Sequence, residues 1–183
     1  DTHAPQWQAE RSEPRAEWIN PAVDELADRI QTGINLAAEV NAVNLIALAL
    51  LASPKHALGE ADLVAQIRLF QTLFAAVPYS QRVTVCADSP EDIIAHGEKL
   101  GWLKRTSHPL GDVLNAEGDQ GILLSYFRNN VLHLAVCASW IGCCLLNNRE
   151  MSRASVARAG RIVYPFLKAE LFLPWSAEAF STE

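Results

Sequence analysis

Paired cysteines, metal-ligand spacings and a surplus of basic residues are all missing from this sequence of 183 residues. The chain has 15 lysines and arginines and 21 aspartates and glutamates, which gives a formal net charge of −6. Binding to nucleic acid requires clustered cations that neutralise phosphates. The composition therefore argues against a nucleic-acid partner, and a DNA-binding helical protein is a weak hypothesis because no basic helix stands out.

The cysteines form no C-x-x-C pair and no second pair at zinc-ligand spacing. Three of the four fall in one apolar run, where a free cysteine behaves as a small hydrophobic residue. We interpret all four as reduced and structural, which predicts a reducing compartment, no metal site and no cofactor. They are Cys86, Cys137, Cys143 and Cys144.

Half of the chain is hydrophobic and a fifth is charged, a balance typical of a core-forming globular chain. Residues 1–18 are polar with scattered charges, and we expect an extended arm or linker there. Residues 19–183 form the predicted folded region. Because the chain starts with aspartate and not methionine, and stops just after a helical segment, we expect a piece of something longer.

The periodicity of apolar residues predicts a mainly α fold, a multi-helix bundle-like lobe with at most one small β element. Asn20-Pro21, Ser89-Pro90 and Ser152 are start signals for helices. Pro165 is expected to kink or divide the last helix. The predicted helices cover about 20–33, 34–52, 60–77, 90–100, 120–146 and 153–173, and the strand candidates are 83–86 and 112–115.

The most apolar of these segments is 120–146, in which 131–146 carries no formally charged residue. This run is shorter than the roughly 18–20 residues that cross a bilayer. We therefore expect a buried core helix and not a membrane span.

A polar cluster stands at the head of this run, in the stretch YFRNNVLH. It consists of Arg128, Asn129, Asn130 and His133. One interpretation is a substrate-binding site, with the guanidinium fork of Arg128 at the centre of an anion site. The other is a buried polar network that joins this helix to Lys168 and Glu170, or to another domain. The sequence leaves both open for Arg128, Asn129 and His133.

Catalytic motifs are scarce. The chain has no G-x-S-x-G elbow, no H-E-x-x-H and no glycine-rich phosphate loop. His108 and Asp112 lie close together in a loop that contains a proline and a glycine. Such a loop does not fix their geometry, so this pair is a weak candidate site.

Four stretches closely resemble one family. They are INLAAEVNAVNLIALALLAS (34–53), VPYS (77–80), GDVL with LLSYFRNNVLH (111–133), and NNREMSR with IVYPFLKAELFLPW (147–175). In this order they are similar to the region of the bacterial membrane-associated glycerol-3-phosphate acyltransferase that lies C-terminal to its acyltransferase domain. The resemblance runs from about Trp18 to Trp175.

The resemblance implies an enzyme that transfers a fatty acyl group from acyl-CoA or acyl-carrier protein to the 1-hydroxyl of glycerol 3-phosphate, the first step of phospholipid biosynthesis. It also implies a peripheral position on the cytoplasmic face of the bacterial inner membrane, with the membrane surface and the upstream acyltransferase domain as partners. In that family, histidine of a His-x-x-x-x-Asp motif is the catalytic base.

No histidine of this chain has aspartate five residues later, and the family's glycerol-phosphate-binding blocks are missing too. No catalytic residue can therefore be assigned, and we expect the chain to be inactive alone. The alternative is a non-catalytic helical interaction module that binds a partner domain or a membrane surface. The upstream reading frame separates the two hypotheses, because only the first requires the catalytic motif there.

Overall fold

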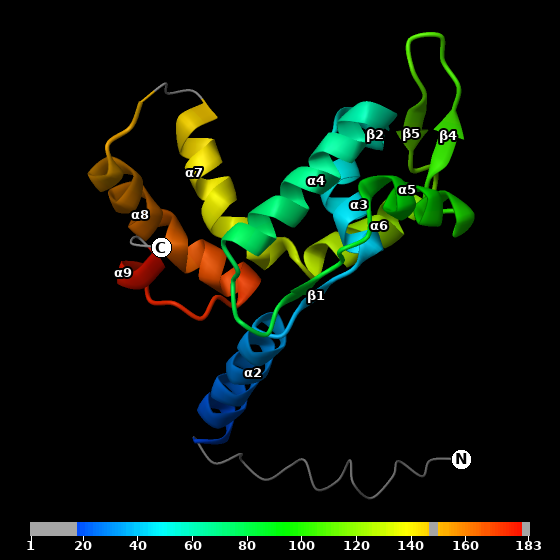
Figure 1. Cartoon of the computed structure of the whole chain (residues 1–183). Helices are drawn as coiled ribbons and strands as arrows, with labels where there is room; N and C mark the ends of the chain where they lie inside the picture. Colours follow the sequence, from blue (N-terminus) through cyan, green and yellow to red (C-terminus); the bar gives the residue numbers. More distant parts are fainter. Residues whose placement is uncertain (1–17, 147–149, 181–183) are drawn as a thin grey trace, which may run out of the picture.

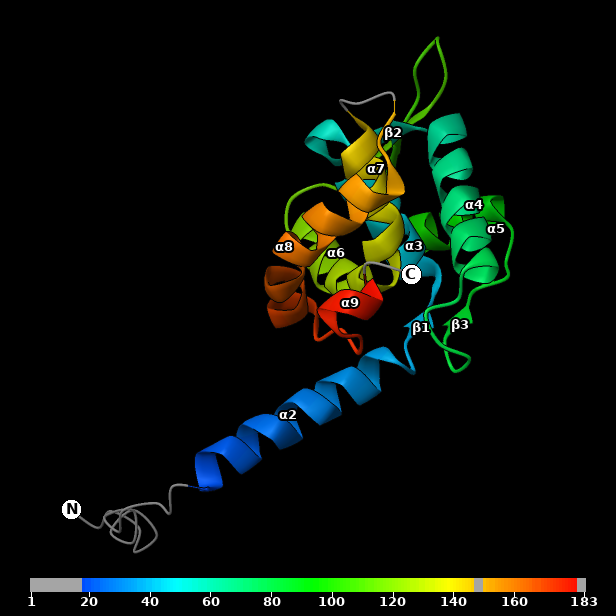
Figure 2. The same cartoon turned by 90° about the vertical axis from the view of Figure 1, so that its left-hand side faces the viewer.

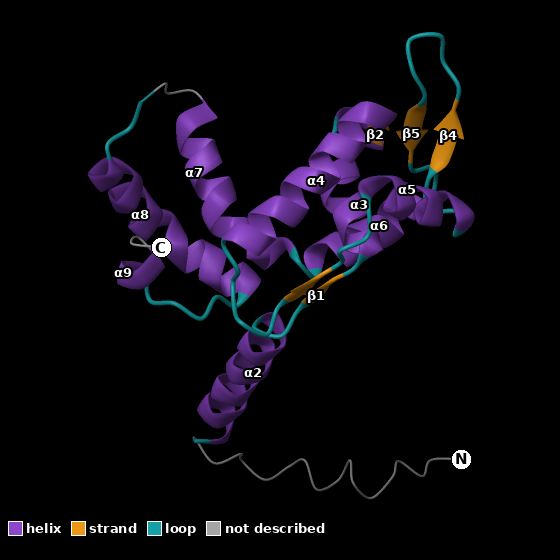
Figure 3. Cartoon of the chain, viewed as in Figure 1, coloured by secondary structure: helices purple, strands orange, loops and turns teal. Residues whose placement is uncertain are grey.

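The computed structural model describes residues 18–146 and 150–180 (Figures 1 and 3). The mainly α class is confirmed, with short strands between the helices. In chain order the elements are α2 (Ile19–Asn35), β1 (Glu39–Val40), α3 (Ala42–Leu51), the 3₁₀ turn η2 (Pro54–His56), β2 (Ala57–Gly59), α4 (Glu60–Ala76), β3 (Thr84–Val85), α5 (Pro90–Lys99), β4 (Lys104–Thr106), β5 (Val113–Asn115), α6 (Gln120–Asn129), the 3₁₀ turn η3 (Leu132–Ala135), α7 (Val136–Leu146), α8 (Arg153–Leu171) and α9 (Ala177–Phe180).

Helix α3 is the centre of the larger of two hydrophobic cores. Every residue from Val43 to Leu50 is buried, and α4, α5 and α6 pack around this helix. Gly97 lets α5 come close, because an added Cβ there would lie 2.7 Å from Ile46 Cδ1. An apolar helix without a polar face is stable only when it is covered on all sides, and this arrangement supplies that cover.

Two small sheets flank this core, where the sequence predicted at most one. Strands β1 and β3 pair in parallel, with Val40 opposite Val85. Strands β2, β5 and β4 form an antiparallel sheet in that order. The strand candidates 83–86 and 112–115 correspond to β3 and β5, whereas β1, β2 and β4 were not predicted from the sequence.

The predicted helix 34–52 is wrong, because the chain unwinds between α2 and α3. Asn41 caps α3: its Oδ1 accepts from Asn44 N at 3.1 Å, and Asn44 Oδ1 accepts from Asn41 N at 2.9 Å. This is a capping box, the reciprocal bonding that satisfies two free N–H groups at a helix start. Asparagine in place of the usual glutamate or glutamine hides it in the sequence.

The predicted helix 120–146 is also divided. α6 ends at Asn129, and α6 and the η3–α7 segment are bent by 63°. At the break, Val131 N donates to Arg128 O and not to Phe127 O, and Asn44 Nδ2 donates to the freed Phe127 carbonyl at 2.8 Å. A side chain from α3 thus supplies the hydrogen bond that an unbroken helix would have made itself.

The second, smaller core joins α7, α8 and α9. Its buried members are Val136, Tyr164, Leu173 and Phe180. The hydroxyl of Tyr164 donates to the carbonyl of Trp175, which folds the C-terminal segment back onto α8. α8 runs without interruption through Pro165, so this proline does not divide it.

The expectation of a fully buried apolar run fails in α7. Its buried residues are Val136 and Cys144, whereas Ile141, Leu145 and Leu146 are exposed. Cys143 is exposed as well, so it is not a core residue. Among the described residues, no single helix meets the length and hydropathy expected of a membrane span, and the bent pair of α6 with η3–α7 meets them only jointly.

The start signal at Asn20-Pro21 is displaced. α2 begins at Ile19 with Trp18 at its N-cap, and no side chain caps it. Asn20 is therefore a helical residue and not the cap. The start signals at Ser89 and Ser152 are confirmed, since Ser89 Oγ accepts from Asp92 N and Ser152 Oγ accepts from Ser155 N.

We predict that Asn44→Ala lowers the free energy of unfolding by about 1–3 kcal/mol, because the buried Phe127 carbonyl loses its partner. Chemical denaturation monitored by circular dichroism measures the change. Asn20→Ala, on the exposed surface of α2, is the matched control and should stay within about 0.5 kcal/mol of the unchanged chain. Equal midpoints for the two variants would contradict the role of Asn44 at the break.

Candidate functional site

The polar cluster of YFRNNVLH lies where α2, the α6–α7 break and the C-terminal end of α8 meet. α8 ends at Leu171, and Phe172 is left-handed with φ of 49°. A helix end leaves carbonyl groups without intrahelical partners, and here α2 supplies them. Asn35 Nδ2 donates to Leu171 O at 2.7 Å, and Thr32 Oγ1 donates to Phe172 O at 3.3 Å.

His133 ties the break to this junction. It is buried, with 2% of its surface exposed, and its Nε2 lies 3.1 Å from Asn35 O. A carbonyl only accepts, so Nε2 must carry the proton. Burial lowers the pKa of His133, which favours the neutral ring. The ring also meets Tyr79 edge to face, with 4.9 Å between centroids, and its role is that of a structural hydrogen-bond donor.

A cavity of about 260 Å³ opens beside His133. Its lining is mostly polar and neutral, with Glu170 as the one formal charge. It is lined by Gln31, Ile34, Asn35, Asn129, Asn130, His133, Glu170, Leu171 and Phe172. No lysine or arginine belongs to this lining, so the cavity lacks the cations that phosphate recognition uses. Amide groups and one carboxylate suit a hydroxyl-bearing or cationic group better.

Arg128 does not line this cavity. It is half-buried, and its Nη2 donates to Asn129 Oδ1 at 3.0 Å. Within residues 18–146 and 150–180 it forms no ion pair, and no hydrogen bond joins it to Lys168 or Glu170. The structure therefore brings Asn129, Asn130 and His133 together around one cavity and leaves Arg128 beside it. A phosphate-binding role for Arg128 stays a prediction.

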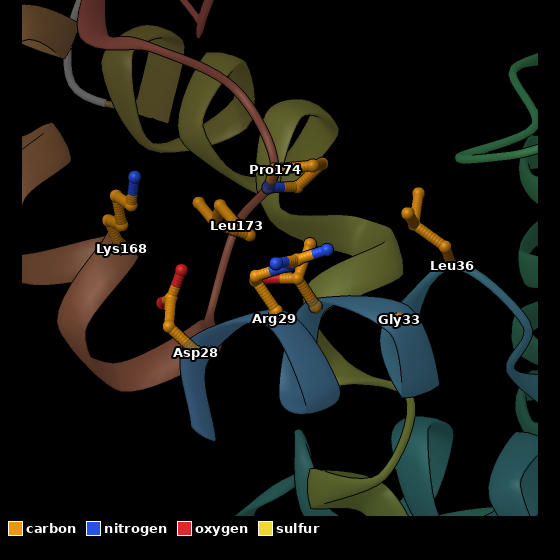
Figure 4. A pocket seen from close by; sticks show the side chains of 8 residues that line it. Asp28, Arg29, Gly33, Leu36, Lys168, Leu173 and Pro174 are labelled. Atoms are coloured by element: carbon orange, nitrogen blue, oxygen red, sulfur yellow. The ribbon is translucent and has the colours of Figure 1, made fainter. Parts of the chain in front are cut away.

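A second cavity, of about 240 Å³, lies between α2 and the end of α8 (Figure 4). Figure 4 shows Asp28 and Arg29 on α2 and Lys168 on α8, with Leu173 and Pro174 on the segment that follows α8. Arg29 and Lys168 make no ion pair with the part of the chain that is described. Two cations at one opening are suited to a carboxylate or phosphate, although Asp28 offsets part of their charge. Sequence reading placed Lys168 in a network with Arg128 and missed this grouping.

Among the described residues, the largest ion-pair cluster lies away from this junction, around Arg105 on β4. Its guanidinium contacts Glu60 at 2.7 Å, Glu98 at 2.8 Å and Asp112 at 3.1 Å. The hydrogen bond from Arg105 lowers the pKa of Glu60 and of Asp112. One arginine thereby holds α4, α5 and the β4–β5 hairpin together.

This cluster also removes His108 and Asp112 as a catalytic pair. Asp112 is occupied by Arg105, and His108 Nδ1 accepts from Leu110 N at 3.2 Å within an exposed loop. Beside them lies a cavity of about 590 Å³ lined by Gly59, Glu60, Ala61, Asp62, Val64, Glu91, Leu110, Gly111 and Asp112. Its carboxylates disfavour a phosphate ligand. In the described ranges no three potential metal ligands gather.

The whole chain matches a known protein family. A family model described as the glycerol-3-phosphate acyltransferase C-terminal region matches residues 1–183. A glycerol-3-phosphate acyltransferase of Xanthomonas campestris pv. campestris is 59% identical over 181 residues, covering 98% of this chain and 20% of that protein. A relative with the same description from Xylella fastidiosa strain M12 is 54% identical over 97% of this chain and 21% of its own length.

A more distant glycerol-3-phosphate acyltransferase, from Shewanella sp. strain MR-7, is 38% identical over 93% of this chain and 21% of that protein. The chain thus spans about a fifth of the length of the curated relatives it matches. No solved structure matches it.

We predict that the chain loses stability as the pH falls from about 6.5 towards the lowered pKa of His133. Over that window the unfolded chain binds a proton that the folded chain excludes, so the equilibrium shifts to the unfolded state. Above the window both states are neutral and the contribution vanishes. Urea midpoints at pH 8 and pH 5 measure it.

The control is His133→Gln, whose amide can donate to Asn35 O but cannot titrate in this range. Its midpoint at pH 8 reports the packing cost of the substitution, and its fall between pH 8 and pH 5 should be smaller than that of the unchanged chain. An equal fall in both proteins would show that other groups cause the acid sensitivity.

Proposed function

The chain belongs to the family of glycerol-3-phosphate acyltransferase C-terminal regions, and from this premise we propose that it is the non-catalytic helical lobe of such an enzyme. The whole protein transfers a fatty acyl group from acyl-CoA or acyl-carrier protein to the 1-hydroxyl of glycerol 3-phosphate. The observation that carries the proposal is the family match over residues 1–183.

The chemistry of the described residues supports a non-catalytic role. Acyl transfer to a hydroxyl uses a general base within hydrogen-bond reach of that hydroxyl. His133 is buried and bonded to a backbone carbonyl, and His108 lies in an exposed loop. The base is therefore expected in the upstream part of the enzyme, where the family carries its His-x-x-x-x-Asp motif.

The same features support a lobe that packs against the upstream acyltransferase domain. The carboxylates of the cavity beside Arg105 and the mostly neutral lining of the cavity beside His133 do not suit the phosphate of the substrate, and at the cavity between α2 and α8 Asp28 offsets part of the charge of Arg29 and Lys168. The lobe's many exposed apolar side chains, among them Ile122, Tyr126 and Phe166, indicate contacts beyond this region of the protein.

We predict that the purified chain, supplied with glycerol 3-phosphate and acyl-CoA, forms no lysophosphatidic acid above background. The full-length enzyme, assayed in the same membrane extract or detergent, is the positive control. Turnover by the chain alone would refute the assignment of catalysis to the upstream part. A full-length protein that is folded but inactive on these substrates would refute the proposed activity itself.

The membrane surface is the second proposed partner, with the enzyme peripheral on the cytoplasmic face of the inner membrane. α7 has 11 residues, so it is about 16 Å long, against a hydrocarbon core of roughly 30 Å. On α8, Ile162 is exposed about one turn from Arg158, and Phe166 is exposed about one turn further along. Helices that lie in a membrane interface combine an exposed apolar face with basic residues on the polar face, so the exposed apolar residues of α8 support this proposal.

We predict that alkaline carbonate releases the full-length enzyme from inner membranes, as expected of a peripheral protein. An integral membrane protein of known topology in the same vesicles is the control, because alkaline carbonate should leave it in the membrane. Cysteines engineered at the exposed residues 130 and 146 should be labelled from the same side of intact vesicles. Labelling from opposite sides would show that this segment crosses the bilayer.

A further inference from the structure

Helix α2 carries an apolar stripe that nothing in the described chain covers. Val23, Leu26, Ile30 and Ile34 recur at three- and four-residue spacing, and each is between 52% and 59% exposed. We call these four residues the outward stripe. No residue of α2 is buried, and Figure 2 shows the helix running away from the rest of the molecule.

The stripe points away from the lobe because α2 uses its polar face for attachment. Thr32 donates to Phe172 O, and this residue is two positions from both Ile30 and Ile34. Two positions correspond to about 200° around an α-helix. The face that meets the lobe is therefore nearly opposite to the outward stripe, although Ile34, at the attached end of α2, also borders the cavity beside His133.

Such a helix lacks the usual source of helical stability. In proteins, most of the stability of a helix comes from tertiary packing of its apolar face and not from its intrinsic propensity. Here only the C-terminal end of α2 is held, by the hydrogen bonds of Thr32 and Asn35. The apolar face must be covered by something outside residues 18–146 and 150–180.

Gly33 gives a second, independent indication. Glycine in a helix interior is about 1 kcal/mol less favourable than alanine, so it normally has a packing reason. A Cβ built on Gly33 meets nothing within 4 Å, and its φ is not positive. Gly33 borders the cavity between α2 and α8, and no packing contact within the described chain requires a glycine there, whereas close approach of another backbone beside Leu26 and Ile30 would.

The charges on α2 argue against a lipid surface as the cover. This helix carries three acidic residues, Asp24, Glu25 and Asp28, and one basic residue, Arg29. Helices that lie in an anionic membrane interface carry lysine and arginine on the polar face instead. A protein surface is the better match for a stripe flanked by acidic and small residues.

The position of α2 in the chain selects among protein partners. The family is a C-terminal region, and it makes up about a fifth of each relative, so most of the remaining length precedes it. α2 is the first described element, and consecutive elements of a chain usually lie next to each other. A second copy would have to find the stripe by diffusion, whereas the upstream part is tethered to it.

We propose that the outward stripe of α2 docks into an apolar groove of the upstream acyltransferase domain, so that α2 is structurally part of that domain while Thr32 and Asn35 anchor the lobe to it. This inference rests on the proposed function, because it takes the upstream domain as the partner. The lobe is then held to the catalytic domain by a helix that belongs to both.

The test uses the full-length enzyme with the photo-crosslinking residue p-benzoylphenylalanine in place of Ile30. Glu25, on the opposite face of α2, is the matched control position. Equal amounts of isotopically light and heavy enzyme are mixed before irradiation. We expect position 30 to crosslink to peptides that precede this region in the same polypeptide, and position 25 to give a much lower yield.

Crosslinks between light and heavy chains would overturn the proposal in favour of self-association, and crosslinks to lipid would overturn it in favour of membrane contact. Equal yields at both positions would also refute it. Acyl transfer by the unmodified enzyme is measured separately. The proposed function fails if that activity is absent, whatever the crosslinks show.

A second measurement does not depend on the bulky photo-crosslinking residue, which can itself disturb the docking of α2. In full-length Ile30→Glu, amide exchange of α2 should become at least about tenfold faster, because loss of docking permits local unfolding. Asn20→Glu adds the same charge at an exposed position of α2 that lies outside the outward stripe and outside the cavity linings, and it should leave the exchange of α2 unchanged. Identical exchange in Ile30→Glu and the unmodified enzyme would contradict the proposal.

Discussion

The architecture depends on one break in an apolar run, at residues 130–131 between α6 and η3. Asn44 takes the Phe127 carbonyl that an unbroken helix would have used, and His133 reaches Asn35 O from the first turn beyond the break. The 63° bend directs α6 onto α3 and α7 towards α8. Without it the same residues would form one long helix, and the two cores would not both close.

The two cores meet at Tyr79, which packs against both. Its ring contacts His133 and Trp175 edge to face, with centroid distances of 4.9 Å in each case. Burial raises the pKa of its hydroxyl, so the side chain stays neutral at physiological pH. The polar residues of YFRNNVLH thus separate into two groups: His133 organises the fold, whereas Arg128, Asn129 and Asn130 remain at or near the surface.

Charge is distributed so that the lobe presents little that attracts a phosphate. Carboxylates line the cavity beside Arg105, and Glu170 is the charge of the cavity beside His133. Arg29 and Lys168 are grouped at one opening, with Asp28 between the same two helices. A lobe of this kind contributes mainly surfaces for contact, and the outward stripe of α2 is one of its exposed apolar ones.

The sequence alone determined the features that depend on neighbours along the chain. Ser89 and Ser152 cap their helices within three residues, α4 follows from its apolar periodicity, and the family follows from long motifs. Tertiary structure decided the rest. Asn44 and Phe127 are 83 residues apart and His133 and Asn35 are 98 apart, and a hydrogen bond over such a distance leaves no local pattern. The same reason hid the orientation of α2: its periodicity predicts an apolar face, but only the bonds from Thr32 and Asn35 to the end of α8 decide that this face points away from the lobe.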